Sequence, residues 1–267
     1  MKFTKMHGLG NDFVVIDAVN QTLPDDLEGM SRRLADRHFG VGCDQVLLVC
    51  PSKIADFKML IFNNDGGEVE MCGNGIRCLA RFVYDHKMTL KTHLEVETMA
   101  GIIKPEIVGN QVRVDMGKPH FDTDDWLWGK TVARDFTLED HTFPITLVSM
   151  GNPHCIIFTK HLTDELVQND GPKMESHPSF PHRINVEFIQ VLNRHELKMR
   201  VWERGTGETL ACGTGASASS VAAVLNGLTD RKMTIHLTGG DLQLEWSENE
   251  HVYMTGPTET VFTGEFK

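Results

Sequence analysis

The chain has 267 residues, with 26 Lys or Arg against 37 Asp or Glu, and its formal net charge at pH 7 is −11. This negative charge argues against nucleic acid or an anionic membrane as the main partner, because either favours a basic surface. The first residues, MKFTKMHGLG, lack the apolar core of a signal peptide, and no apolar run approaches the roughly 20 residues of a membrane span. We therefore expect a cytoplasmic protein of one large domain or two smaller ones, and small anionic substrates remain open.

The first 117 residues show strand patterns and one clear helix. After the stretch CGNG, the apolar residues Ile76, Leu79, Ala80 and Val83 fall on one stripe at helical spacing. A shorter helix is expected at 31–38, with Ser31 as its N-cap. Alternating or β-branched character predicts strands at 13–19, 45–50, 57–63, 93–98 and 111–116.

The rest of the chain again shows strand patterns and one main helix. A helix is expected over 216–226, where nearly every residue is small or apolar, so it should be buried and wrapped by sheet. A short helix is expected at 163–170, capped by Thr163. The stretch from 118 to about 141 has no clear period and is interpreted as a crossover, while 259–267 should form a strand that returns to the first half. Further strands are predicted at 145–150, 154–159, 185–192, 196–204, 232–238, 241–246 and 251–256.

The chain contains an internal duplication. The stretch CGNG at Cys72 recurs as CGTG at Cys212, 140 residues later, and upstream Gly and Glu residues match at the same offset. GNDFVVI at 10–16 lies over GNPHCII at 151–157, and DQVLLV at 44–49 lies over NVEFIQ at 185–190, both at an offset of 141. We therefore expect two pseudo-symmetric halves, formed by 1–117 with about 258–267 and by 118–257.

The six cysteines fall into two groups. Neither C-x-x-C nor a Cys/His cluster of zinc spacing occurs, so we predict reduced thiols, no metal and no cofactor. Four cysteines lie inside strand or helix patterns and are interpreted as packed thiols: Cys43, Cys50, Cys78 and Cys155.

Cys72 and Cys212 are different, because glycines flank them and a helix follows each. A pseudo-two-fold axis would place both on the walls of one cleft, where two helix N-termini can bind a carboxylate. A helix end contributes about 0.3–1 kcal/mol, which is less than one pKa unit, so a neighbouring base is needed to form a thiolate. His154 and Glu203 are the best candidates. This arrangement suits cofactor-independent racemisation or epimerisation, in which a thiolate removes the Cα proton and a thiol returns one to the opposite face.

Five segments in order strengthen this interpretation: HGLGNDFVVID, FNNDGGEVEMCGNGIRCLARF, MGNPHC, RINVEF and ERGTGETLACGTGA. Together they strongly resemble the diaminopimelate epimerase family, across nearly the whole chain except about 118–145. The resemblance implies an α/β fold of the α+β type, with two halves that each curl a mostly antiparallel sheet around a central helix and share a cleft. It also implies interconversion of LL- and meso-2,6-diaminopimelate without pyridoxal phosphate, on the route to lysine and peptidoglycan, by a homodimer.

The resemblance implies roles for individual residues. Cys72 and Cys212 are the acid–base pair, with His154 assisting Cys72 and Glu203 assisting Cys212. Arg204 should pair with the distal carboxylate. Cys43 stands where the family more often has an aromatic residue. The expected substrate-binding positions are Asn11, Gln45, Asn63, Gly73, Asn74, Asn152, Asn185, Glu203, Arg204, Gly213 and Thr214.

Two other functions stay open at this point. One is another two-cysteine racemase, of the proline or hydroxyproline type, which would not need Arg204 at the far end of the cleft. The other is a binding or redox-sensing protein that uses Cys72 and Cys212 as a switchable pair.

Overall fold

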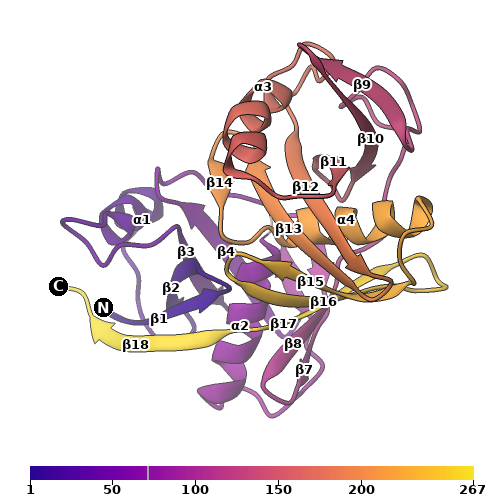
Figure 1. The fold of residues 1–267 in the computed structure, drawn as a ribbon. Coiled ribbons are helices and arrows are strands. Elements are labelled where there is room, and N and C mark those ends of the chain that lie inside the picture. Colours follow the sequence, from indigo (N-terminus) through magenta and orange to yellow (C-terminus); the bar gives the residue numbers. More distant parts are fainter. Residues whose placement is uncertain (71) are drawn as a thin grey trace. The chain divides into compact units, whose positions relative to one another are not determined.

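The computed structural model describes residues 1–70 and 72–267, which form two units (Figure 1). The N-terminal unit comprises Met1–Asp115 and Thr255–Lys267, and the C-terminal unit comprises Met116–Met254. These bounds differ by a few residues from those of the predicted halves. Each unit is a mixed α/β structure in which strands surround one buried helix, so the predicted fold class is confirmed.

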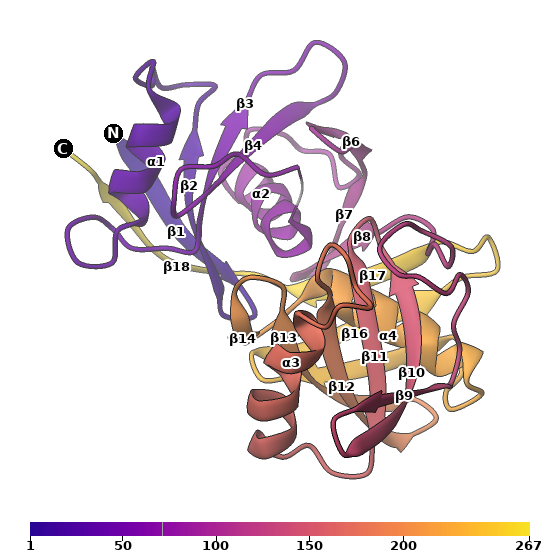
Figure 2. The same cartoon turned by 90° about the horizontal axis from the view of Figure 1, so that it is seen from above.

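The N-terminal unit holds a sheet of order β18-β1-β2-β3-β4-β5-β6, mostly antiparallel, in which β2 and β3 pair in parallel and so do β4 and β5. Helix α2 contacts β1 to β4 and the hairpin β7–β8 (Figure 2). The first eight residues of α2 are buried. Strand β18 pairs with β1, as predicted for the C-terminal strand. The elements are β1 (Lys2–Gly8), β2 (Asn11–Asp17), α1 (Leu27–Ala35), β3 (Gln45–Cys50), β4 (Phe57–Asn63), α2 (Gly73–Asp85), β5 (Val96–Thr98), β6 (Gly101–Ile103), β7 (Pro105–Val108), β8 (Gln111–Asp115) and β18 (Glu259–Glu265).

The C-terminal unit repeats this plan with the sheet β16-β15-β13-β12-β11-β10-β9, and β14 pairs with β13. Helix α4 contacts β10, β11, β12, β15 and β16. Strand β17 (Val252–Pro257) leads the chain back to the N-terminal unit. The remaining elements are β9 (Arg134–Leu138), β10 (His141–Ser149), β11 (Pro153–Thr159), the π-helix η1 (Leu166–Asp170), α3 (Gly171–Glu175), β12 (Asn185–Asn193), β13 (Glu196–Glu203), β14 (Gly207–Thr209), α4 (Gly213–Leu225), β15 (Lys232–Leu237) and β16 (Gly240–Trp246).

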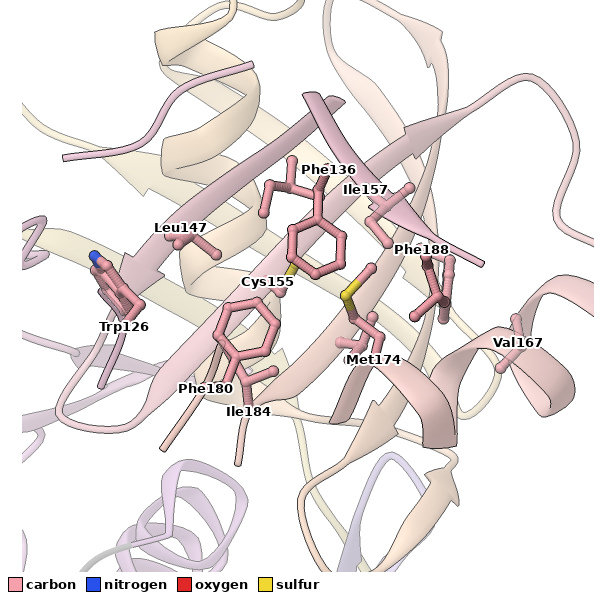
Figure 3. Close-up of a cluster of buried hydrophobic side chains, with 13 residues drawn as sticks. Trp126, Phe136, Leu147, Cys155, Ile157, Val167, Met174, Phe180, Ile184 and Phe188 are labelled. Carbon is pink, nitrogen blue, oxygen red and sulfur yellow. The ribbon is translucent and has the colours of Figure 1, made fainter. Parts of the chain in front are cut away.

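Alternation along the strands divides each unit into two packed layers. In the C-terminal unit, Cys155, Ile157 and Phe188 belong to an aromatic-rich core cluster with Phe136 and Phe180 (Figure 3). The residues between them on β11 and β12 point to the opposite face, because successive side chains of a strand alternate. That opposite face is the one that α4 covers.

Strand pairing corrects one alignment of the repeat. Phe13 pairs with Gln45 between β2 and β3, and His154 pairs with Asn185 between β11 and β12. The structural counterpart of Asn185 is therefore Gln45, at an offset of 140, and the predicted offset of 141 for this segment was wrong. The N-terminal unit carries one additional residue between the two paired strands.

Two local predictions were also wrong. The crossover at 118–141 contains β9, whose Phe136 and Leu138 are buried and which turns into β10 through a two-residue hairpin. The strand β1 was not predicted.

Helix α1 begins at Leu27, and the Asp26 carboxylate accepts the N–H of Gly29, so Asp26 is the N-cap. The predicted cap Ser31 lies buried inside this helix, whereas the Thr163 hydroxyl does accept the N–H of Leu166.

The cap of α1 gives a direct stability test. Asp26→Ala should lower the free energy of unfolding by about 1 kcal/mol, because the first turn loses a side-chain acceptor. Ser31→Ala is the control: the Ser31 hydroxyl is buried with no hydrogen-bond partner among residues 1–70 and 72–267, so its loss should cost less than about 0.5 kcal/mol. Urea unfolding of both variants measures the difference, and an equal or larger loss for Ser31→Ala would contradict the assignment of the cap.

Candidate active site

Both central helices begin at a cysteine. Cys72 is the N-cap of α2 and Cys212 is the N-cap of α4. Each sulfur accepts the N–H of the glycine three residues later, Gly75 or Gly215, and both N···S distances are 3.4 Å. The first turn of a helix leaves N–H groups without intrahelical partners, so each cysteine stands beside donors that can hold an anion.

In the N-terminal unit, Asn11 links the start of α2 to an acidic anchor. Its Oδ1 atom accepts the Asn74 side-chain amide at 3.2 Å and lies 3.7 Å from the Cys72 sulfur, with the thiol as donor. Its Nδ2 atom donates to Asp44 at 2.9 Å. Because a carboxylate only accepts, this contact fixes the amide so that its oxygen faces Cys72.

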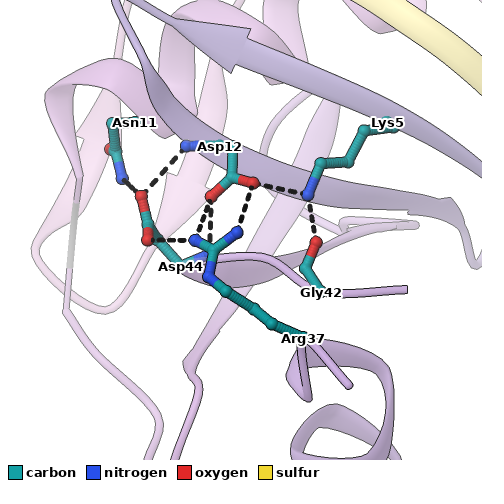
Figure 4. A network of polar contacts seen from close by, with 6 residues as sticks. All are labelled: Lys5, Asn11, Asp12, Arg37, Gly42 and Asp44. Atoms are coloured by element: carbon teal, nitrogen blue, oxygen red, sulfur yellow. Dashed lines mark hydrogen bonds and ion pairs between the residues drawn. The ribbon is translucent and has the colours of Figure 1, made fainter. Parts of the chain in front are cut away.

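The anchor is itself held by a network of charges (Figure 4). Arg37 donates to Asp44 at 2.7 Å and to Asp12 at 2.9 Å, and Lys5 donates to Asp12 at 2.6 Å. Burial alone would raise the pKa of Asp12, but hydrogen bonds from Arg37 and Lys5 outweigh it and hold the pKa at about 2. The Asp12 carboxylate is therefore ionised, and Arg37 holds it and the Asp44 side chain in place behind Asn11.

Two more predicted residues of this unit meet at the ends of neighbouring strands. The Gln45 side-chain amide donates to Asn63 Oδ1 at 2.9 Å, and the two residues pair across β3 and β4. Both residues are partly exposed, but the Gln45 Oε1 atom is buried and has no hydrogen-bond partner in the described part of the chain.

In the C-terminal unit, Asn152 occupies the position of Asn11 with the opposite orientation. Its Nδ2 atom donates to the Thr214 hydroxyl at 3.3 Å, and that hydroxyl lies 3.6 Å from the Cys212 sulfur. Its Oδ1 atom lies 3.0 Å from His154 Nε2. His154 is fully buried, and both ring nitrogens are engaged within this unit, so the expected assistance to Cys72 stays a prediction.

Glu187 also lies in this region, although it was not among the predicted catalytic or substrate-binding residues. Its Oε1 atom lies 2.7 Å from His154 Nδ1, and neither side chain is exposed to solvent. A signal was present, because Glu187 is the one charged residue in the otherwise apolar run from Val186 to Ile189. A buried carboxylate needs a partner, and that requirement could have pointed to it.

Burial dominates the acid–base properties of the second cysteine. It raises the pKa of Cys212 well above the ordinary value, and the charges of Glu203 and Glu187 raise it further, against hydrogen bonds from Thr214 and Gly215. The positive helix end expected to lower this pKa is therefore outweighed. Burial also raises the pKa of Glu203, although its hydrogen bond from Thr209 opposes the shift.

Asn185 begins β12 and Arg204 directly follows β13, and the two residues are in contact. The Asn185 side chain accepts the Arg204 N–H and donates to the Pro153 carbonyl, both at 2.9 Å. Arg204 is exposed, and its guanidinium donates to the His182 carbonyl at 3.1 Å. Arg204 is thus held at its backbone while its charged end reaches solvent, as a group that binds a ligand carboxylate would require.

The other buried cysteines behave as packed thiols. Burial raises the pKa of Cys43 to about 11 and that of Cys78 to about 12, and it raises the pKa of Cys155 well above the ordinary value. Within residues 1–70 and 72–267, no group of three or more His, Cys, Asp or Glu side chains is arranged to hold a metal ion. No helix in the same part of the chain is long and apolar enough to cross a membrane.

Solved structures place this fold in a class of two-unit α/β proteins. A phenazine biosynthesis protein of the PhzF family from Bacillus anthracis matches with a TM-score of 0.72 at 18% identity, covering 100% of this chain and 99% of its own. A hydroxyproline epimerase from Agrobacterium vitis matches with a TM-score of 0.70 at 16% identity, covering 99% of this chain and 91% of its own. At these identities the likeness concerns the fold alone.

The sequence assigns the family. The chain belongs to the diaminopimelate epimerase family, whose model matches residues 3–121 and 146–261. The diaminopimelate epimerase of Moorella thermoacetica is 53% identical over 276 residues, covering 100% of this chain and 99% of that protein. That of Pelotomaculum thermopropionicum is 50% identical with the same coverage. The family resemblance stated from the sequence is thereby confirmed, and the segment between the two matched ranges includes β9.

The two glycines after the cysteines should not tolerate substitution equally. A Cβ on Gly215 would lie 2.5 Å from Glu187 Oε1, a contact that forces a buried carboxylate to move, whereas a Cβ on Gly75 would meet its nearest atoms at 3.3 Å. Gly215→Ala should therefore lower the free energy of unfolding by about 1–3 kcal/mol, as overpacking does. Gly75→Ala, the matched control, should change it by no more than about 1 kcal/mol, because helix propensity offsets the tighter contact. Equal losses in chemical denaturation would contradict this difference.

Proposed function

We propose that this protein interconverts LL- and meso-2,6-diaminopimelate without a cofactor, with Cys72 and Cys212 as the two acid–base groups at one Cα. Membership of the diaminopimelate epimerase family supports the substrate. The observation that carries the mechanism is that each unit begins its buried helix at a cysteine, with the same N–H···S geometry. The reaction would take place on the route to lysine and peptidoglycan.

The proton transfer uses both thiols and the donors beside them. One sulfur, as thiolate, removes the Cα proton, and the other, as thiol, delivers a proton to the opposite face. The negative charge that develops on the reacting carboxylate is held by backbone N–H groups of Gly73, Asn74, Gly213 and Thr214. Such preorganised donors stabilise charge that develops in the transition state, and removal of one typically costs about 10²–10³ in rate.

Glu203 is proposed as the base that serves Cys212. A carboxylate of raised pKa is a better proton acceptor than an ordinary one, and the mutual effects of Glu203 and Cys212 on their pKa values support a shared proton. His154 is proposed to assist Cys72, as the resemblance implies. The remaining polar groups of the substrate would be bound by Asn11, Gln45, Asn63, Asn152, Asn185, Glu203 and Arg204.

A proline- or hydroxyproline-type racemase is the second candidate, because a hydroxyproline epimerase shares the fold. It is the weaker candidate, since this chain is 16% identical to that hydroxyproline epimerase but 53% identical to a diaminopimelate epimerase. Action in the cytoplasm as a homodimer stays a prediction that follows from the family.

The two cysteines can be tested by proton NMR in D2O. With reduced protein, LL-diaminopimelate and no cofactor, the Cα–H signal should disappear as the meso isomer forms. Cys72→Ala and Cys212→Ala should each lower the rate by about 10²–10⁴, the usual contribution of a general acid or base. Cys50→Ala, a thiol at the end of β3, is the control and should retain activity. If diaminopimelate stays inert with folded, reduced wild-type protein, the proposed substrate is wrong.

Arg204 separates the two candidate functions. Arg204→Ala should lower kcat/KM for diaminopimelate by about 10²-fold, because a bidentate pair with the distal carboxylate is lost. A proline-type enzyme has no distal carboxylate to bind and should lose little. Arg194→Ala is the matched control, since Arg194 pairs with Asp230 on the surface of the same unit at 2.6 Å and such exposed pairs contribute little. Unchanged diaminopimelate kinetics in Arg204→Ala would contradict the assigned role.

A further inference from the structure

The side chains packed beneath the first turn of the central helix are apolar in the N-terminal unit and polar in the C-terminal unit. In the N-terminal unit, Phe13 and Leu47 are fully buried on the strand face opposite Val14, Val46 and the α1 core. A Cβ on Gly75 would meet Leu47 Cδ2 at 3.3 Å, which places Leu47 directly under the first turn of α2. This unit therefore packs its cysteine-capped helix on an apolar pair.

The C-terminal unit has His154 and Glu187 at the corresponding places. His154 matches Phe13 and Glu187 matches Leu47, because the strands pair in the same register. The Glu187 carboxylate takes the position under the first turn of α4, within 2.5 Å of a Cβ on Gly215. Its second oxygen, Oε2, is buried with no hydrogen-bond partner in the described part of the chain.

A buried carboxylate with an unsatisfied oxygen is costly, and an apolar pair performs the same packing in the other unit. Stability alone therefore does not account for His154 and Glu187. The polar pair must serve something that the apolar pair cannot.

The contacts lead from Glu187 to the cysteine. Glu187 lies 2.7 Å from His154, and His154 lies 3.0 Å from Asn152. Asn152 donates to Thr214 at 3.3 Å, and Thr214 lies 3.6 Å from the Cys212 sulfur. All five side chains belong to the C-terminal unit.

The donors and acceptors of this chain fix an orientation. Because the Asn152 nitrogen donates to Thr214, its oxygen faces His154, and Nε2 of that ring must carry a proton. The imidazole ring can hold this proton toward Asn152 only if its other nitrogen is also fixed. The Glu187 carboxylate, 2.7 Å from Nδ1, fixes that nitrogen, in the way that a carboxylate orients a histidine ring in many sites.

We propose that Glu187 is a positioning residue of the C-terminal cysteine site, which acts through His154 to fix the Asn152 amide. The proposal rests on the proposed function, because it assumes that Cys212 and Asn152 act on the substrate. The titratable groups that face Glu187 are His154 on β11, Cys212 at the start of α4 and Glu203 on β13. The charge of Glu187 also raises the pKa of Cys155 on β11.

Three variants distinguish a role of Glu187 in positioning His154 from a role in packing alone. Glu187→Leu removes the partner of the His154 ring, whereas Glu187→Gln keeps an oxygen that can accept from Nδ1. The double variant His154→Phe with Glu187→Leu reproduces the apolar pair of the N-terminal unit. Asp170→Asn is the control, since Asp170 is a buried carboxylate paired with His141 at 3.3 Å in the same unit.

We expect Glu187→Leu to lower kcat/KM for diaminopimelate at least about tenfold, since small misplacements of positioned groups have effects of this size. Glu187→Gln should lose less, and Asp170→Asn should match the wild type. The double variant should regain the melting temperature that Glu187→Leu loses, because an apolar pair replaces a stranded polar group, yet its kcat/KM should stay as low as that of Glu187→Leu or lower. If activity returns together with the melting temperature, Glu187 is only structural and the proposal fails.

Two readouts do not depend on turnover. Long-range ¹H–¹⁵N spectra should show one fixed protonation pattern for His154 in the wild type and averaging between patterns in Glu187→Leu. The rate of Cys212 alkylation by iodoacetamide should change at least about threefold in that variant, with Cys72 of the same molecule as the reference. If the wild type is inert on diaminopimelate, the proposed function fails while these readouts still decide on Glu187. Unchanged spectra and alkylation in Glu187→Leu would overturn the proposal.

Discussion

The start of each central helix is the constraint on which the rest of this structure depends. Helices α2 and α4 are buried along most of their length, and a buried helix end must satisfy N–H groups that have no intrahelical partner. Cys72 and Cys212 each accept one of these groups and leave others at the same place. The glycines that follow let neighbouring atoms approach closely. A helix packed in this way brings a thiol and a set of anion-binding donors to one point, and the curled sheets keep that point in place.

Much of this fold could be predicted because its signals are local. Strand alternation and the C-G-x-G stretches are properties of short segments, and they gave the two central helices and most strands. The errors arose where two local signals competed. Ser31 is a good N-cap type, but the apolar stripe of Leu27, Met30 and Leu34 begins the helix earlier, and Asp26 precedes it. The hairpin of β9 was hidden by acidic neighbours, although Phe136 and Leu138 alternate into the core.

The residues around the cysteines were predictable only in part. Asn11 and Asn152 stand in glycine-containing motifs that recur, so a repeat comparison finds them. Glu187 was not found, because its importance depends on which strand face it occupies and which residue lies beside it. A shift of one residue in the repeat alignment reverses the faces of a strand. With the observed register, Glu187 matches Leu47, and the exchange of an apolar residue for a buried carboxylate becomes visible.

The same comparison shows how a duplicated scaffold can serve the two different proton transfers of the proposed reaction. Asn11 is anchored on Asp44, so it turns an amide oxygen, an acceptor, toward Cys72. Asn152 is anchored on His154, so it turns an amide nitrogen, a donor, toward Thr214 beside Cys212. Two equivalent sites would hold their thiols in the same protonation state, whereas a two-base reaction needs one proton acceptor and one proton donor at a time. Opposite amide orientations make the two sites inequivalent while the backbone repeat is preserved. In this fold the symmetry lies in the helices and strands, and the difference that the proposed two-base reaction requires lies in the side chains that anchor one asparagine in each unit.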